Sequence, residues 1–282
     1  MEIGNSIQKE FSFFDKSIKK KNCQCYKLFA HYNPNSFSFS IFNIENEEFL
    51  SLDSCIFNSN KTNLNYLLSQ FPIMKWNLNS MAINYFFKTC TIVPNSLFDE
   101  KLKRKYLEIN NQIDEDEYVL ADRLKHINAV VLYSIPKSHL NALRNLPNIG
   151  IKHSATIFLE NILEKSKHST NSEFFVDVST KTFNIALVKS SKLIFYNNFE
   201  FQTKNDFLYY ILNCYNTLDL NSKEITLRIS GEFEKDEIIN NLKMYIKKII
   251  IEKRPKSYSY SHLLNTIPNH YFHKLFNQLK CE

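Results

Sequence analysis

Asp177 is the residue whose type and position best suit ligand chemistry. It stands in the apolar stretch FFVDV (174–178), and a short polar turn follows it. A carboxylate can hold Mg²⁺, while hydroxyl groups and a lysine can hold the phosphates of a nucleotide. The sequence therefore offers one candidate nucleotide cleft. Its candidate ligands are Asp177, Ser179, Thr180, Lys181 and, from the later stretch LRISG (227–231), Gly231.

Glycine is too scarce for the common nucleotide-binding loops. The chain contains only three glycines, Gly4, Gly150 and Gly231. A Walker loop, a dinucleotide-binding loop and a kinase lid each need several glycines close together. The sequence excludes all three motifs, so a nucleotide would have to be held in another way.

Simpler roles compete with ligand binding at the same positions. A carboxylate at the end of a strand often caps the turn that follows, and this is the favoured interpretation of Asp177. Cys23 and Cys25 form a single C-x-C without a second pair, which favours idle thiols over a zinc site. His270 and His273 could reach one metal ion, but no third ligand accompanies them. We predict no metal site and no catalytic residue.

Composition indicates a folded chain without a membrane segment. Of its 282 residues 44% are hydrophobic, including 24 Phe and 15 Tyr, which is enough for a large core. No run approaches the roughly 20 apolar residues of a membrane-spanning helix, and no signal peptide opens the chain, so we expect a cytoplasmic protein. The net charge of +6 comes mostly from lysine, and no RNA-binding or zinc-finger motif accompanies it. Nucleic-acid binding is therefore disfavoured.

The order of expected elements occurs twice along the chain. From residue 173 the pattern predicts three strands, a helix, a strand, a helix, a short strand and a last helix after Pro268. Residues 26–43 share their hydrophobic pattern with residues 172–189, and residues 48–71 share theirs with 192–215. An extra segment, 87–124, interrupts the first copy. That copy then resumes with a strand at 129–135, a helix, a strand at 150–154 and a helix. The pattern indicates an internal duplication.

Longer stretches resemble a known architecture. NAVVLYSIPKSHLNALRNLPNIGIKHSATIFLENIL (128–163) followed by FFVDVSTKTFNIALVKSSKLIFYNNF (174–199) is similar to the centre of the actin-like scaffolds of type IV pilus assembly. With LRISGE and the ending SHLLNTIPNHYFHKLFNQLKCE, the chain resembles an uncharacterised bacterial family with a duplicated ribonuclease H-like (actin-like ATPase) fold.

That resemblance implies a mixed α/β fold with two lobes, each a five-stranded mixed sheet flanked by helices. The implied division is an N-terminal extension (1–22), lobe I (23–169) with the insertion 87–124, and lobe II (170–282).

The resemblance also implies where a nucleotide would bind. In actin-like ATPases one hairpin from each lobe wraps the phosphates and Mg²⁺, and a glycine turn holds the adenosine. These features fall on His31 to Ser36, on Asp177 to Thr182, and on Ser230 with Gly231.

Both hairpins depart from the pattern that the resemblance implies. His31 stands where an acid is expected, and Val178 with Ser179 stand where the second hairpin needs glycine. Each non-glycine residue forced to positive φ costs roughly 1–2 kcal/mol. Two or three of them would cost on the order of 2–6 kcal/mol, and each 1.4 kcal/mol is about a tenfold loss in affinity. We expect no catalytic ATP hydrolysis and no tightly held cofactor, while weak binding of ATP with Mg²⁺ stays open.

Three functional hypotheses follow. The favoured one is a non-catalytic actin-like scaffold of the bacterial cytoplasm, a pseudo-ATPase that binds a protein partner through the insertion 87–124. The alternative is a nucleotide-binding switch with slow or no hydrolysis. The remote alternative is a metal-dependent ribonuclease H-like nuclease, which needs Asp177, Asp206 and Glu232 to converge on metal ions. The partner, the process and the oligomeric state are not predicted.

Overall fold

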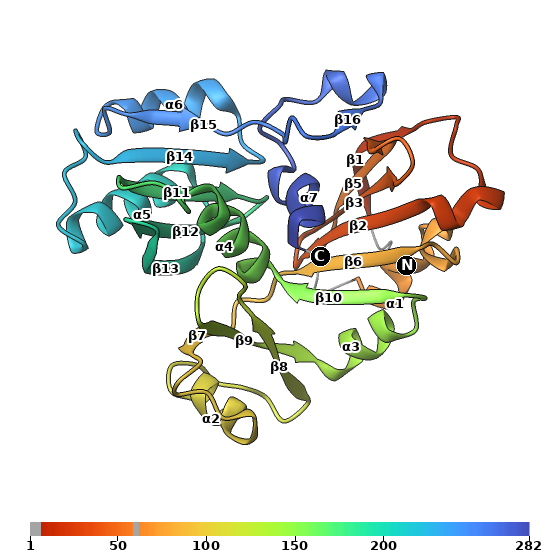
Figure 1. Ribbon diagram of the computed structural model, residues 1–282, viewed down its shortest axis with the longest axis horizontal. Helices are drawn as coiled ribbons and strands as arrows, with labels where there is room; N and C mark the ends of the chain where they lie inside the picture. The colour runs from red at the N-terminus through yellow and green to blue at the C-terminus, as the bar shows by residue number, and fades with distance from the viewer. Residues whose placement is uncertain (1–6, 59–61, 282) are drawn as a thin grey trace, which may run out of the picture.

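Two large mixed sheets lie side by side, and a smaller antiparallel sheet lies below them in the view of Figure 1. The computed structural model describes residues 7–58 and 62–281. We call each large sheet with its helices a lobe. The two-lobed, mixed α/β class expected from the sequence is confirmed.

The first sheet contains eight strands. Its main path runs in the spatial order β1 (Gln8–Phe14), β5 (Ser51–Ile56), β3 (Ser36–Asn43), β2 (Tyr26–Asn33), β6 (Ser80–Tyr85) and β10 (Ile149–His153). Off this path, β4 (Glu48–Phe49) pairs with β3 and β16 (Ser259–Tyr260) pairs with β4. Five of the strands expected from the sequence, namely β2, β3, β5, β6 and β10, are present in this sheet, and three more extend them. These three additions correct the expectation of a five-stranded first sheet.

The second sheet contains the five strands that the sequence predicts. They lie in the order β13 (Lys192–Glu200), β12 (Thr182–Lys189), β11 (Ser172–Val178), β14 (Thr226–Gly231) and β15 (Ile249–Ile251). β11 and β12 are antiparallel, as are β12 and β13, while β11, β14 and β15 are parallel. The corresponding strands β2, β3, β5, β6 and β10 of the first sheet have the same order and directions.

Two segments assigned elsewhere hydrogen-bond into the first sheet. Residues 8–14, predicted to be part of an N-terminal extension, pair with β5; residues 1–6 of that extension lie outside the described residues. Residues 259–260, placed in the second lobe, pair with β4. The boundaries at 23 and 170 stay predictions, but the first sheet recruits strands from both sides of them.

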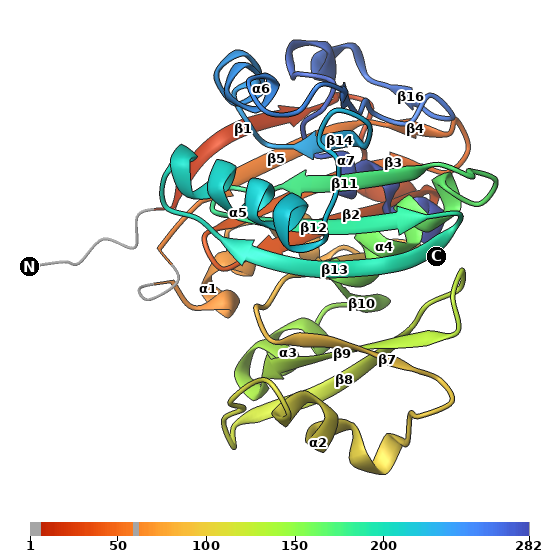
Figure 2. The same cartoon turned by 90° about the vertical axis from the view of Figure 1, so that its left-hand side faces the viewer.

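The third sheet forms an inserted module, residues 90–136, below the two lobes in Figure 2. It consists of β7 (Cys90–Pro94), β8 (Glu117–Arg123) and β9 (Ala129–Pro136), with α2 (Lys103–Glu108) packed on it. The prediction that residues 129–135 return to the first sheet is wrong, because β9 pairs with β7 and β8 instead. An apolar strand alone does not say which sheet it joins.

Helices cover both faces of each large sheet. On the outer faces, α1 (Leu64–Ser69) and α3 (Lys137–Arg144) pack on the first sheet, and α5 (Lys204–Thr217) and α6 (Lys235–Lys243) on the second. Thr203 and Asp206 form a capping box that begins α5. Among the described residues, no helix is long and apolar enough to cross a membrane.

Two helices cross between the lobes. α4 (Ser154–Lys165) follows the last strand of the first sheet and packs on the second, where Phe158 meets Phe175. α7 (His273–Asn277) comes from the end of the chain and packs on the first sheet, where Phe276 meets Phe49. A large apolar side chain buried in this way stabilises the fold by about 1.5–3 kcal/mol. These crossings place α7 between the lobes, at the ends of β2 and β11 (Figure 1).

Candidate functional site

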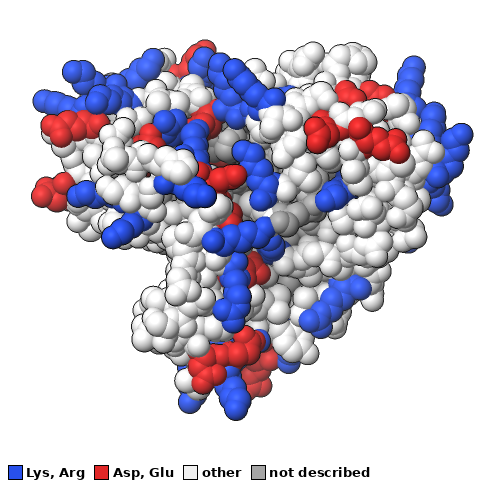
Figure 3. All heavy atoms as spheres, in the orientation of Figure 1, with Lys and Arg blue, Asp and Glu red and all other residues white. Residues whose placement is uncertain are grey.

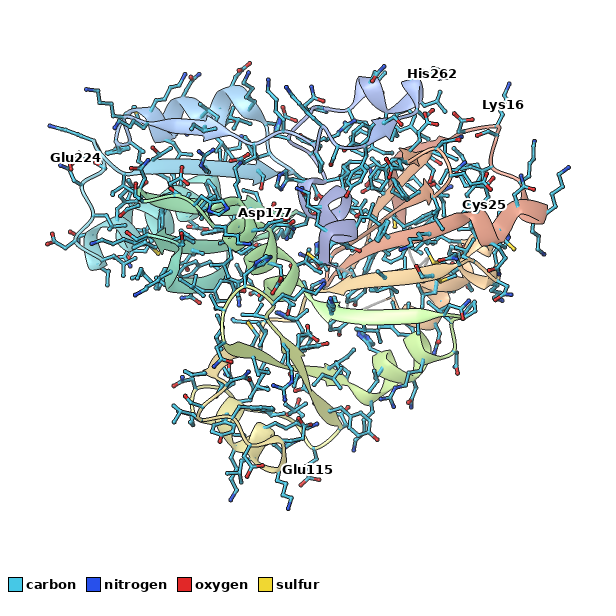
Figure 4. The ribbon with its side chains drawn as sticks, in the orientation of Figure 1. Lys16, Cys25, Glu115, Asp177, Glu224 and His262 are labelled. Carbon is cyan, nitrogen blue, oxygen red and sulfur yellow. The ribbon has the colours of Figure 1, made fainter. Side chains whose placement is uncertain are left out.

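Asp177 lies near the end of β11, between the lobes (Figure 4). It contacts a cation from α7. Its Oδ2 lies 2.8 Å from Lys274 Nζ, and the exposed fractions of the two side chains are only 1% and 6%. Ser230 Oγ, on the neighbouring strand β14, donates to Asp177 Oδ1 at 2.6 Å. One carboxylate oxygen therefore accepts a hydrogen bond from the chain itself, and the other faces an ammonium of the chain as an ion pair.

Lys274 joins three elements at this point. Besides the ion pair, its Nζ donates to Ser179 Oγ at 3.2 Å and to Ser154 Oγ at 3.3 Å. Ser179 begins the turn between β11 and β12, and Ser154 is the first residue of α4. Two hydrogen bonds and one ion pair therefore tie this ammonium to its surroundings. A buried charge needs such partners, and here they come from both lobes.

The two hairpins that would wrap the phosphates touch each other. Asn33, at the end of β2, donates from Nδ2 to Thr182 Oγ1 at the start of β12, at a distance of 2.8 Å. Both side chains are buried. The contact joins the first lobe to the second directly, and it holds the hairpins together with no room for a phosphate between these two atoms.

His31 is a neutral imidazole. Its Nδ1 donates to the carbonyl of Asn84 at 3.2 Å, and its buried Nε2 has no hydrogen-bond partner. Burial, and after it the nearby ammonium of Lys274, lowers the pKa of His31 to about 3. A neutral, buried imidazole does not supply the hard oxygen ligand that Mg²⁺ prefers.

Gly231 is required by the backbone rather than by a ligand. Its φ is 105°, and a Cβ there would lie 1.9 Å from the carbonyl oxygen of Val178. Its N–H donates to the carbonyl of His270 at 2.8 Å. The donor that an adenosine turn would offer is thus already bonded to the C-terminal segment.

The other predicted ligands lie at the tip of the second hairpin. Thr180 is half-buried and Lys181 is exposed, while the N–H of Ser179 donates to the carbonyl of Thr182 at 2.8 Å. Lys274 therefore brings Asp177 and Ser179 together, whereas Thr180 and Lys181 form the turn beyond them. Their role as nucleotide ligands stays a prediction.

A small cavity lies between the hairpins and α7. Its volume is about 10 Å³, and residues 272–275 line it together with His31, Asp177 and Gly231. That volume holds roughly one water molecule. Glu232 also lines this cavity, and burial raises the pKa of its carboxyl to about 8. Glu232 is therefore protonated at neutral pH and supplies no negative charge for a metal ion.

The carboxylates of the nuclease hypothesis do not meet. Asp206 caps its own helix by accepting from the N–H groups of Gln202 and Thr203. Throughout residues 7–58 and 62–281, no three acidic, histidine or cysteine side chains are grouped so that they could hold a metal ion. His270 is instead bonded to the carbonyl of Phe233 at 3.1 Å.

Two members of the site, Ser154 and Lys274, were not predicted from the sequence, and Asn33 was covered only as part of the hairpin His31 to Ser36 that the resemblance implies. A signal for Lys274 was present, because this lysine stands inside the aromatic and aliphatic run YFHKLF (271–276). A lysine in a buried run needs a buried partner. Nothing local identifies the partner, since Ser179 lies 95 residues away.

Comparison with known proteins gives a family and a fold. The model of the family described as "Protein of unknown function (DUF3822)" matches residues 15–249. A structure from Bacteroides thetaiotaomicron VPI-5482, described as a protein with actin-like ATPase fold and unknown function, is 23% identical with a TM-score of 0.78. The match covers 94% of this chain and 99% of that one.

A second structure has the same architecture at lower similarity. It is described as the PilM–PilN type IV pilus biogenesis complex and is 8% identical, with a TM-score of 0.60. The match covers 91% of this chain and 98% of that one. No curated protein matches the sequence. The expected similarity to actin-like proteins and to a pilus-assembly scaffold is confirmed at the level of fold.

Proposed function

The chain belongs to the family of Protein of unknown function (DUF3822), and on that premise we propose that it is a non-catalytic actin-like scaffold that binds a protein partner. It has kept the two-lobed fold and replaced the nucleotide by contacts of its own. We place it in the bacterial cytoplasm and interpret the matching strand orders of the two sheets as an internal duplication.

One observation carries the proposal: the Lys274 ammonium occupies the position between the hairpins. It pairs with Asp177 at 2.8 Å, and the cavity beside it measures about 10 Å³. Sites for small molecules usually measure about 300–1,000 Å³. A triphosphate has no room there while α7 is in place.

A nucleotide would have to displace this buried pair. Removing one partner of a buried ion pair costs about 3–5 kcal/mol, because it leaves the other charge without compensation. Since each 1.4 kcal/mol is tenfold, that cost alone weakens binding by roughly 10² to 4 × 10³-fold. Moving α7 would also expose the apolar side chains of Leu275 and Phe276. The nucleotide-switch alternative requires all of these changes together.

The inserted module is the proposed partner-binding surface. It exposes large apolar side chains at Leu97, Ile109 and Tyr118, with exposed fractions of 65%, 74% and 46%. Apolar side chains that are exposed together in one patch mark protein-binding surfaces, and these three belong to one small module. The PilM–PilN complex, a structure of the same fold, is an assembly of two proteins, which supports a protein partner for this chain.

Crosslinking in cells tests this function. We expect the wild-type chain to capture a reproducible protein partner and Leu97→Ser/Ile109→Ser to lose it while keeping its thermal stability. Tyr209→Ser is the matched control, because Tyr209 is 63% exposed on α5, far from the module in sequence. Loss of the partner in the control but not in the double variant would overturn the assignment of the surface. Robust ATP turnover without a partner would overturn the function itself.

A further inference from the structure

A second and much larger hollow lies at the junction of the lobes. This groove has a volume of about 330 Å³ and is lined by α4, β11, β14, α7 and residues 252–255. Its volume falls in the range of small-molecule sites, roughly 300–1,000 Å³. The groove therefore has the size that the cavity between the hairpins lacks.

The wall of the groove that α4 and the second sheet form is apolar. Phe158 and Ile162 of α4 and Phe175 of β11 line it, and all three side chains are buried in the core. Asn161 contributes a hydrogen-bond acceptor to this wall. Its Oδ1 is buried without a hydrogen-bond partner, while its Nδ2 donates to the carbonyl of Ile157. A ligand with an apolar body and a hydrogen-bond donor would suit these groups.

The inner charges of the groove are already paired. Arg228 contacts Glu173 at 2.7 Å and Glu252 at 3.0 Å, and Lys165 also pairs with Glu252. Lys274 has Asp177 as its partner. These groups shape the groove, but their charges are largely compensated.

Two lysines at the edge of the groove have no acidic partner among the described residues. Lys253 and Lys280 line the groove and are exposed, and neither takes part in an ion pair within the part of the chain that the structure describes. The one unpaired acid in the lining is Glu164, which is exposed. The uncompensated charge is therefore positive. On the face drawn in Figure 3, basic side chains gather along the junction between the lobes.

We propose that this interlobe groove binds a small organic anion: a carboxylate, sulfonate or phosphate group attached to an aromatic or aliphatic body. The body lies against Phe158 and Phe175, and the anionic group faces Lys253 and Lys280. Because both lobes contribute to the lining, the ligand adds contacts across the junction that Lys274 already holds. The site does not depend on the hairpins or on a nucleobase.

Two fluorescent probes that share an aromatic body test the proposal. 8-Anilinonaphthalene-1-sulfonate carries the anion, and N-phenyl-1-naphthylamine has a closely similar body without it. We expect saturable binding of the sulfonate at about one site per chain, and at least about tenfold weaker binding of the neutral probe. Sodium decanoate should displace the sulfonate.

Charge reversal at the edge locates the site. Lys253→Glu/Lys280→Glu should weaken binding of the sulfonate by about tenfold or more and leave the affinity for the neutral probe unchanged. Lys223→Glu/Lys243→Glu is the control, because both lysines are exposed and outside the groove. Both variants change only exposed side chains, and circular dichroism melting confirms that they fold.

Several results would overturn the proposal. Equal affinity of the protein for the two probes would show that the anionic group does not contribute to binding. An unchanged affinity for the sulfonate in Lys253→Glu/Lys280→Glu would show that the probe binds elsewhere. Binding of the sulfonate that does not saturate by about 1 mM would show that the groove is not a specific site. Displacement by a glutamate-rich peptide containing phenylalanine, but not by decanoate, would assign the groove to a protein segment instead.

Discussion

Replacing Lys274 by methionine removes the cation from the interlobe site while keeping an unbranched side chain that is only one atom shorter. Asp177 then stays buried, with Ser230 as its remaining close hydrogen-bond donor. The carboxylate loses a partner at 2.8 Å. We expect Lys274→Met to be strongly destabilising, although it replaces a charged residue by an apolar one inside an apolar run.

The magnitude follows from the geometry. At 2.8 Å and an effective dielectric constant of about 20, the attraction is roughly 6 kcal/mol before desolvation. Desolvation offsets much of it, so the pair as a whole contributes little compared with an apolar pair. Removal of one partner is different, because an uncompensated buried charge costs about 3–5 kcal/mol. A domain is stable by only about 5–15 kcal/mol, so the loss is easily measured.

The assay is a double-mutant cycle followed by urea unfolding. Far-UV circular dichroism reports on both lobes, and Trp76, the single tryptophan, reports on the first lobe. We expect Lys274→Met and Asp177→Asn each to lose about 3–5 kcal/mol, and Asp177→Asn/Lys274→Met to recover most of that loss. The control cycle uses Lys204 and Glu237, an ion pair whose side chains are 52% and 51% exposed, and should give a coupling below about 1 kcal/mol.

Additive losses of stability in the double-mutant cycle would refute the reasoning about the buried pair. If each single variant loses less than about 1 kcal/mol, or if the double variant loses the sum of the two, the charges are not coupled in the way that the geometry requires. An interlobe coupling no larger than that of the exposed control pair would lead to the same conclusion.

Three further predictions concern single positions. Gly231→Ala should cost more than about 2 kcal/mol in urea unfolding, because its φ is 105° and its Cβ would lie 1.9 Å from a carbonyl oxygen, whereas Gly150→Ala meets its nearest atom at 3.7 Å and should change stability by less than about 1 kcal/mol. The pKa of His31 is about 3 in the folded state against an ordinary value of 6.5, so its contribution to stability is lost as pH falls below 6.5; His31→Gln should make the urea midpoint less dependent on pH between 7 and 5, and an identical slope in both proteins would contradict this. The pKa of Glu232 is about 8 against 4.5, so the folded state binds the extra proton and stability falls as pH rises from 4.5 to 8; the thermal midpoint of Glu232→Gln should therefore rise relative to wild type across that interval, and a constant difference would count against a protonated carboxyl.

The strands of both lobes could be predicted because their signals are local. The runs of aromatic and β-branched residues around Phe183 and Ile185, separated by short turns, indicate strands whatever their partners are. The order of the elements then favoured two similar sheets, and the structure contains both. The position of residues 129–136 could not be predicted in the same way, because the choice between two sheets depends on tertiary packing.

Part of the candidate site could not be predicted, because it too depends on tertiary packing. Asp177 and Gly231 were identifiable by residue type, and the missing glycines excluded the common nucleotide-binding loops. What replaces the ligand comes from distant parts of the chain, namely Lys274 from α7 and Asn33 from the first hairpin. No spacing in the sequence relates Lys274 to Asp177, whereas the resemblance already implied that the hairpin carrying Asn33 lies opposite the hairpin that begins at Asp177.

Calorimetric titration with ATP, with and without Mg²⁺, tests the central claim most directly. The Lys274–Asp177 pair closes the space between the hairpins, so we predict no saturable heat up to millimolar ATP for the wild-type chain. Saturable binding below about 100 µM that Asp177→Ala abolishes would contradict the account, because it would show that α7 yields its position to a nucleotide.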